Sequence, residues 1–289
     1  MHPPCPACGA PTATGLKTWH YACGACSYEG STLQPRIQAQ VAGGDLDESA
    51  RESSLETLRR NNFRRLRSLI RHLGVAAPGS MPKLLDVGCA HGWFIEECQS
   101  GFEVIGIEPD LAVAEATRRR GLPVRTGFFP EGVAADERFD VISFNDVLEH
   151  IPDLASTLQA CHRHLNEGGL LVVNAPSRKG VFYRLSRLLA RMGAPGPFER
   201  MWQKDFPSPH VHYFDTASMT AIAARHGFRL ESRSTLPSMT VKGLYARLRY
   251  SRDVSAVKAG VMATAITLAS PLLAVLPADI NVWTFRPVS

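Results

Sequence analysis

The stretch 83–110, KLLDVGCAHGWFIEECQSGFEVIGIEPD, constrains the fold more than any other part of the chain. It opens with a short apolar run at 84–87, interrupted only by Asp86, which is the pattern of a parallel strand buried on both faces. A glycine-containing turn, a helix-like stretch and a second apolar strand at 104–107 follow, and that strand ends in Glu108. This order predicts half of a doubly wound α/β sheet, whose ligand sits beyond the carboxyl ends of the strands.

The turn after the first strand separates two classes of ligand. A dinucleotide fingerprint G-x-G-x-x-G would need a third glycine where Trp93 stands, so that pattern is broken. The stretch resembles instead the D-x-G-x-G-x-G signature of class I S-adenosylmethionine (SAM) methyltransferases. Asp86, Gly88 and Gly92 match this signature, whereas Ala90 replaces its middle glycine.

The resemblance implies that SAM is the cofactor and that small residues in the turn approach its methionine moiety and sugar. It also implies that Glu108 accepts hydrogen bonds from both ribose hydroxyls. Two alternatives are a nucleotide-type crevice with another ligand and an α/β turn without a ligand.

Composition sets broad limits on the protein. The 289 residues, 45% of them hydrophobic, fit one large domain with attachments. A net charge of +5 permits an anionic surface as partner without requiring one. The start of the chain lacks the charged-then-apolar pattern of a signal sequence. Three of the seven cysteines lie outside the N-terminal pattern described below, and an odd number does not suit a disulfide scaffold. We therefore expect a reducing, cytoplasmic location.

The N-terminal region carries two C-x-x-C knuckles, formed by Cys5, Cys8, Cys23 and Cys26. Two knuckles at this separation can bring four thiolates to the corners of a tetrahedron, which suits structural zinc in a zinc ribbon. A redox C-x-x-C pair is the alternative. Only Lys17 supplies a positive charge between the knuckles, so we do not expect this ribbon to bind nucleic acid.

A long helix is predicted from Asp47 onward, because leucines recur at helical spacing up to Leu73. Six arginines lie in the same stretch: Arg59, Arg60, Arg64, Arg65, Arg67 and Arg71. They indicate the solvated face of a helix packed on the sheet, or a phosphate- or membrane-facing patch. In the family that the chain resembles, a helix before the first strand often closes over the cofactor.

The block 139–153, FDVISFNDVLEHIPD, closely resembles the fourth-strand motif of small-molecule SAM methyltransferases. The resemblance implies that Asn145, Asp146 and His150 reach the rim of the crevice, hold the amino and carboxylate ends of SAM and border its methyl group. For the loop after the third strand, the resemblance implies that Phe128 or Phe129 stacks on the adenine. Core packing is the alternative for either ring. The expected cofactor contacts are Asp86, Gly88, Cys89, Ala90, Gly92, Trp93, Glu108, Pro109, Phe128, Asn145, Asp146 and Val147.

Two insertions interrupt the expected domain, at about 178–210 and 236–278. The first holds a basic amphipathic helix at 180–192, whose apolar stripe of Phe182, Leu185, Leu188 and Leu189 suits a lid helix or a membrane contact. The second holds the apolar stretch 254–277, in which Lys258, internal threonines and prolines argue against a membrane span. We expect packed helices or helices in peripheral contact with a membrane.

Histidines are the candidate catalytic residues. A hydroxyl acceptor needs a base, and an imidazole that titrates near neutrality suits this role. His150 is the first candidate and His210 is the second, and both could instead position the acceptor or pack. His210 and His212 alternate in a stretch that resembles the H-x-x-x-F segment of the ubiquinone-biosynthesis (type 11/23) subgroup, so only one of them is expected to point inward.

The sequence therefore predicts an α/β protein with a Rossmann-like, seven-stranded class I methyltransferase sheet, helices on both faces and helical insertions. The predicted domains are a zinc ribbon at 1–34 and the methyltransferase domain at 45–289. The predicted function is SAM-dependent methyl transfer, most simply O-methylation, to a small molecule such as a lipid, quinone or saccharide. The alternatives are a nucleic-acid or protein methyltransferase that docks its substrate through the ribbon, and a non-catalytic SAM-binding protein.

Overall fold

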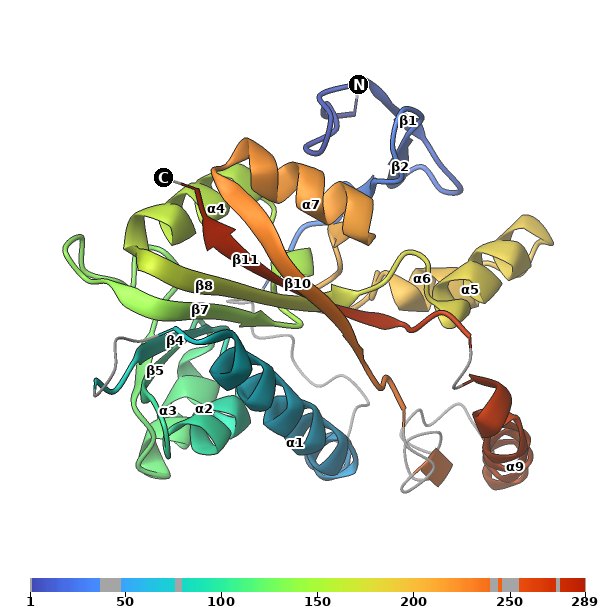
Figure 1. The fold of residues 1–289 in the computed structure, drawn as a ribbon. Coiled ribbons are helices and arrows are strands. Elements are labelled where there is room, and N and C mark those ends of the chain that lie inside the picture. Colours follow the sequence, from blue (N-terminus) through green and yellow to red (C-terminus); the bar gives the residue numbers. More distant parts are fainter. Residues whose placement is uncertain are drawn as a thin grey trace.

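The computed structural model describes residues 2–36, 48–75, 80–239, 244–245, 255–273 and 276–288. Its centre is a seven-stranded sheet with the strand order β10-β11-β8-β7-β4-β5-β6 (Figure 1). The strands are β4 (Lys83–Val87), β5 (Glu103–Glu108), β6 (Val124–Thr126), β7 (Phe139–Asn145), β8 (Leu165–Pro176), β10 (Phe228–Leu236) and β11 (Ile280–Pro287). β4 to β8 pair in parallel, and β11 runs antiparallel to both of its neighbours. The predicted sheet, including the antiparallel last strand, is confirmed.

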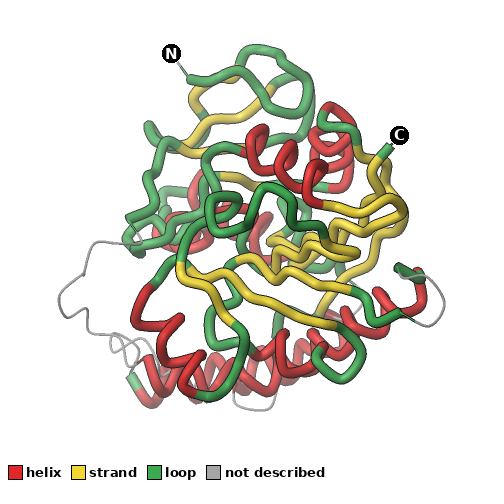
Figure 2. The backbone as a smooth tube through the Cα atoms, turned by 90° about the vertical axis from the view of Figure 1, so that its left-hand side faces the viewer, coloured by secondary structure: helices red, strands yellow, loops and turns green. Residues whose placement is uncertain are grey.

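Helices cover both faces of this sheet (Figures 1 and 2). One face carries α1 (Glu48–Leu73), α2 (Trp93–Cys98) and α3 (Leu111–Arg119), and the other carries α4 (Leu154–His164) and α7 (Thr216–Arg225). Two separate clusters of buried side chains correspond to the two faces. Further helices are η1 (Leu148–His150), α5 (Val181–Arg191), α6 (Gly196–Met201) and α9 (Ala256–Leu273). The sheet is therefore buried on both sides, as its apolar strands predict.

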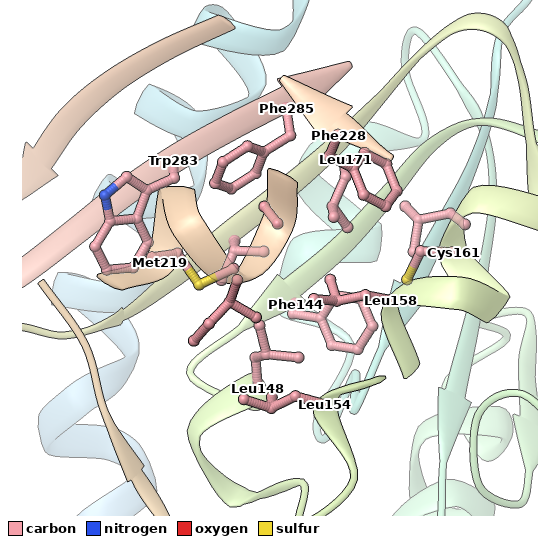
Figure 3. Close-up of a cluster of buried hydrophobic side chains, with 14 of the residues drawn as sticks. Phe144, Leu148, Leu154, Leu158, Cys161, Leu171, Met219, Phe228, Trp283 and Phe285 are labelled. Atoms are coloured by element: carbon pink, nitrogen blue, oxygen red, sulfur yellow. The ribbon is translucent and has the colours of Figure 1, made fainter. Parts of the chain in front are cut away.

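The core under α4 and α7 fixes the short helix η1. Leu148 is fully buried and belongs to the same cluster as Phe144, Leu154 and Met219 (Figure 3). Because this leucine anchors η1 in the core, the position of the next two residues is set by packing. Those residues line the cavity described in the next subsection.

The N-terminal ribbon shares a sheet with the larger domain. Its strands β1 (Thr12–Thr14), β2 (His20–Cys23) and β3 (Glu29–Ser31) continue into β9 (His212–Tyr213), which gives the order β1-β2-β3-β9. Ser31 adds a hydrogen bond from its backbone N to Val211 O at 3.0 Å and one from its Oγ to His210 O at 2.8 Å. The ribbon is thus joined by backbone hydrogen bonds to the segment that carries His210. The predicted ribbon boundary at residue 34 lies within the described residues, whereas the predicted start of the methyltransferase domain at residue 45 lies outside them.

A buried carboxylate ties the ribbon to α5. Glu29 is fully buried, and its carboxylate contacts His20 Nε2 at 3.1 Å and Arg178 Nε and Arg187 Nη1 at 2.8 Å each. The Tyr183 hydroxyl also donates to Glu29. Burial by itself would raise the pKa of Glu29, but the hydrogen bond from His20 and the two guanidinium groups outweigh it and lower that pKa to about 2.

The two inserted helices bury less apolar surface than their sequences suggest. In α5 the buried side chains are Tyr183 and Ser186, whereas Leu185 and Leu188 of the predicted stripe are 49% and 52% exposed. In α9, Val257 and Leu268 are each 78% exposed. Within the described ranges, no helix combines the length and apolar character that a bilayer span requires. Peripheral membrane contact through these helices stays a prediction.

Replacing Glu29 by glutamine tests the link between the ribbon and α5. We expect Glu29→Gln to lower the free energy of unfolding near neutral pH by about 3 kcal/mol, because it leaves two partly buried guanidinium groups without their counter-charge. Urea unfolding measures this, and Glu167→Gln, which removes an exposed carboxylate, is the control.

The pH dependence of this difference has a defined sign. A carboxyl whose pKa falls from 4.5 to about 2 on folding stabilises the protein above the higher value, and this stabilisation is lost as the pH falls toward the lower one. The difference between wild type and Glu29→Gln should therefore shrink as the pH is lowered from about 5 to about 3. A difference that stays constant over this range would contradict the assignment.

Candidate active site

A cavity of about 680 Å³ opens at the carboxyl ends of β4, β5 and β7. One part of its wall is formed by the turn after β4 and by Glu108 at the end of β5. The opposite part is formed by η1 and by the segment before β9, with His150 and His210. The cavity therefore joins the predicted cofactor-binding residues and the predicted catalytic residues in one space.

The turn after β4 depends on three residues with left-handed backbone conformations. Gly88, Ala90 and Gly92 have φ angles of 68°, 43° and 71°. A Cβ atom at Gly88 would lie 2.6 Å from Cγ2 of Val147, so glycine is needed there for space as well as for φ. Ala90 stands where the methyltransferase signature has its middle glycine, and it adopts a left-handed backbone conformation although it is not glycine.

Glu108 holds this turn in place. Its Oε2 accepts a hydrogen bond from Ala90 N at 2.9 Å, and its Oε1 accepts one from Asp110 N at 2.9 Å. The carboxylate is mostly buried at the cavity wall, and burial raises its pKa while the two N–H donors oppose that rise. The two oxygens have further lone pairs that can accept hydrogen bonds from the hydroxyls of a ligand.

A row of buried polar side chains crosses the strand ends behind the cavity. Asp86 accepts hydrogen bonds at 2.8 Å from Ser143 Oγ and from Asn145 Nδ2. Asn145 Oδ1 accepts from Asn174 Nδ2 at 2.7 Å, and Asn174 Oδ1 accepts from Asp146 N at 3.1 Å. Burial raises the pKa of Asp86 to about 7, although both hydrogen bonds lower it. This row aligns the ends of β4, β7 and β8 and so fixes the backbone on which Asp146 stands.

The predicted cofactor contacts fall into two groups. Those that line the cavity are Gly88, Ala90, Glu108, Pro109, Phe128, Asp146 and Val147. Those that stand behind its wall are Asp86, Cys89, Gly92, Trp93 and Asn145. In the second group Cys89 and Trp93 are buried in the core on the α2 side of the sheet. These residues shape the turn rather than face the cavity.

The two phenylalanines after the third parallel strand have different surroundings. Phe128 is 44% exposed at the cavity. Phe129 is buried, and its ring meets Phe144 edge-on at 5.9 Å between centroids. Both rings line the cavity, and Phe128 is the more exposed of the two.

Three titratable side chains meet at the wall formed by η1 and the segment before β9. The ligand-capable atoms of Glu149, His150 and His210 all lie within 4.8 Å of one another. Burial raises the pKa of Glu149 well above its ordinary value and lowers the pKa of both histidines, that of His210 most strongly. His212 points elsewhere, because its Nε2 lies 2.9 Å from Ile151 O and its other ring nitrogen contacts Tyr28.

Among the cavity residues that sequence reasoning missed, three contact predicted site residues. Glu149 lies inside the V-L-E-H run, so its place next to His150 was a usable signal. Arg59 of α1 lies 3.7 Å from Asp146 at the cavity wall, and only the packing of α1 brings it there. Gln203 approaches His210 from the loop after α6, with 2.9 Å between the two Nε2 atoms.

The four ribbon cysteines, Cys5, Cys8, Cys23 and Cys26, form one group. Their sulfurs are 3.5 Å apart for Cys5 and Cys26, 3.5 Å for Cys8 and Cys23, and 3.7 Å for Cys8 and Cys26. A tetrahedral zinc with bonds of ~2.3 Å places its sulfurs ~3.8 Å apart, so the geometry fits this metal. The group lies away from the cavity and shares no lining residue with it.

Comparison with known proteins settles the family. Residues 58–233 match the model of a family described as a methyltransferase domain. The chain belongs to this family. Its fold is that of the class I SAM-dependent methyltransferases, as the sequence predicts.

Curated relatives cover part of this domain. The chain is 34% identical over 152 residues to the ubiquinone biosynthesis O-methyltransferase of Pseudomonas aeruginosa strain LESB58, which covers 50% of this chain and 62% of the relative. The enzyme of the same name from Alkalilimnicola ehrlichii is 31% identical over 120 residues, or 39% of this chain and 47% of the relative. The methyltransferase thus spans about half to three fifths of the length of these relatives.

Solved structures share the fold at low sequence identity. A SAM-dependent methyltransferase from Thermotoga maritima superposes with a TM-score of 0.53 and 16% identity, covering 83% of this chain and 94% of that one. Magnesium protoporphyrin IX methyltransferase from Synechocystis PCC 6803 gives a TM-score of 0.52 and 11% identity, covering 87% and 91%. At these identities the likeness establishes the fold alone.

An added methyl group at Gly88 tests the turn. Gly88→Ala should lower the free energy of unfolding by more than about 1 kcal/mol, because alanine is strained at this φ and its Cβ collides with Val147. Gly101→Ala is the matched control, since nothing lies within 4 Å of a Cβ there. Equal stability of the two variants in urea would show that the turn tolerates a side chain.

Proposed function

We propose that the protein transfers the methyl group of SAM to a hydroxyl group of a small-molecule acceptor. The observation that carries this proposal is the single cavity that joins Glu108 and the Gly88 turn to the cluster of Glu149, His150 and His210. In this arrangement the ribose hydroxyls of SAM donate to Glu108, the adenine lies beside Phe128, and the sulfonium methyl faces the histidines. The names of the curated relatives support an oxygen acceptor.

The reaction needs alignment and loss of a proton. The acceptor oxygen attacks the methyl carbon opposite the sulfur, the carbon–sulfur bond breaks, and its electron pair stays on sulfur, which leaves S-adenosylhomocysteine and a methyl ether. The cavity walls hold the two reactants in line. The hydroxyl must also lose its proton, and in this proposal His150 and His210 lie next to that hydroxyl.

Titration with SAM tests the cofactor assignment. We expect isothermal calorimetry to show binding of SAM and of S-adenosylhomocysteine to the wild type. Glu108→Ala should weaken both by about 100-fold, because hydrogen bonds from two ribose hydroxyls to a carboxylate are lost. Glu115→Ala, on the exposed side of α3, is the control. A folded wild type that binds neither ligand would remove the proposed function.

We also propose that the ribbon cysteines hold structural zinc. All four sulfurs would be ligands, so the site is closed and its role is to keep β3 in position for pairing with β9. Through Ser31 this pairing supports the backbone of His210. The ribbon would therefore act on the cavity by holding its wall.

Substitution of Co²⁺ for Zn²⁺ tests whether the four ribbon cysteines hold the metal, because thiolate ligands give Co²⁺ a distinctive absorption. We expect Co²⁺ to give the strong thiolate-to-metal absorption of a four-cysteine site, and Cys8→Ser to diminish it. Cys161→Ala removes a buried cysteine outside the ribbon and should leave the absorption unchanged. No thiolate absorption in the folded wild type would argue against a four-cysteine metal site.

A further inference from the structure

The cluster of Glu149, His150 and His210 contains polar atoms that the protein itself leaves unsatisfied. Glu149 is 1% exposed and His210 is 5% exposed. Neither carboxylate oxygen of Glu149, nor Nδ1 of His210, has a hydrogen-bond partner among the described residues. Burying such groups without a partner costs free energy, more so for a charged carboxylate. A buried carboxylate between two imidazoles is stabilised when a cation binds all three.

The hydrogen bonds of the two rings leave the correct nitrogens free for a metal. His150 Nδ1 lies 3.0 Å from Pro209 O and donates to it, so Nε2 is the nitrogen with a free lone pair. That Nε2 lies 4.0 Å from Oε1 of Glu149. The contact of His210 with Gln203 occupies its Nε2, which leaves Nδ1 directed into the cluster.

These outer contacts match what metal-bound histidines require. A ligating imidazole donates its other N–H to a carbonyl or carboxylate, which fixes the tautomer and the orientation of the ring. Pro209 O does this for His150. The amide oxygen of Gln203 does it for His210 when that amide presents Oε1 to the ring, since an amide group can turn either atom toward a partner.

We propose that Glu149, His150 and His210 bind a divalent transition-metal cation of the Mn²⁺ or Zn²⁺ class. Two imidazoles and one carboxylate form a three-ligand set that suits these ions better than Mg²⁺, which prefers oxygen ligands. Tetrahedral ligand atoms at ~2.1 Å from one cation lie ~3.4 Å apart, so ligand atoms now up to 4.8 Å apart must close by up to about 1.4 Å on binding. This site is separate from the four ribbon cysteines, which share no residue with it.

The role of this cation rests on the proposed methyl transfer. Three protein ligands leave coordination positions open toward the cavity, and a hydroxyl oxygen of the acceptor takes one of them. When bound, the metal would lower the pKa of that hydroxyl so that its proton is lost to solvent, and the oxygen would then attack the methyl carbon of SAM. The histidines then act as metal ligands, and the cation replaces the general base that the sequence predicts.

Electron paramagnetic resonance with Mn²⁺ tests the site, using the full-length protein with its ribbon loaded with zinc. We expect one Mn²⁺ to bind per chain, and Glu149→Gln and His210→Asn each to weaken binding at least tenfold. Glu167→Gln and His226→Gln, which lie outside the cluster, should bind Mn²⁺ as the wild type does. Equilibrium dialysis against Zn²⁺ should give two zinc ions per wild-type chain and one per cluster variant.

Binding of S-adenosylhomocysteine to each variant checks that it is folded and separates the two proposals. The inference is supported if the cluster variants lose metal binding but still bind S-adenosylhomocysteine. Zinc confined to the ribbon together with no bound Mn²⁺, or metal binding that the cluster variants do not change, would overturn it whatever the cofactor result. Failure to bind S-adenosylhomocysteine with intact metal binding would count against the methyl-transfer proposal alone.

Discussion

The hydrogen bond from the backbone of Ala90 to the carboxylate of Glu108 is the contact on which the cavity depends. It joins the turn after β4 to the end of β5, so two strand ends are held at one rim. Gly88 makes the turn possible because only a residue without a Cβ fits beside Val147. The row from Asp86 through Asn145 to Asn174 aligns the next two strands in the same way. Together these contacts form a pre-organised crevice before any ligand enters.

The second wall of the cavity is built by a different part of the molecule. Leu148 anchors η1 in the core, and the ribbon holds the segment that carries His210 through Ser31 and the pairing of β3 with β9. The buried ion cluster around Glu29 fixes the ribbon to α5. Stability of the ribbon and geometry of the acceptor side are therefore coupled, although the ribbon cysteines contribute nothing to the cavity itself.

The sequence predicts the sheet well because its signals are local. The apolar strands, the turn at 88–92 and the terminal acid Glu108 each follow from neighbouring residues, and the comparison with the methyltransferase family agrees with them. The acceptor side is harder to predict because it is made by contacts between distant segments. Arg59 meets Asp146, and Glu149 meets His210, only after α1 and β9 have packed. The buried face of α5 is hard to predict for the same reason, since Tyr183, and not Leu185, contacts Glu29.

The central claim is that one cavity brings SAM and an acceptor together. A crystal structure of the protein with S-adenosylhomocysteine tests this most directly. The account predicts the ribose hydroxyls within hydrogen-bond distance of Glu108, the adenine beside Phe128, and the sulfur directed at the cluster of Glu149, His150 and His210. A ligand bound elsewhere, or with its sulfur turned away from that cluster, would contradict it.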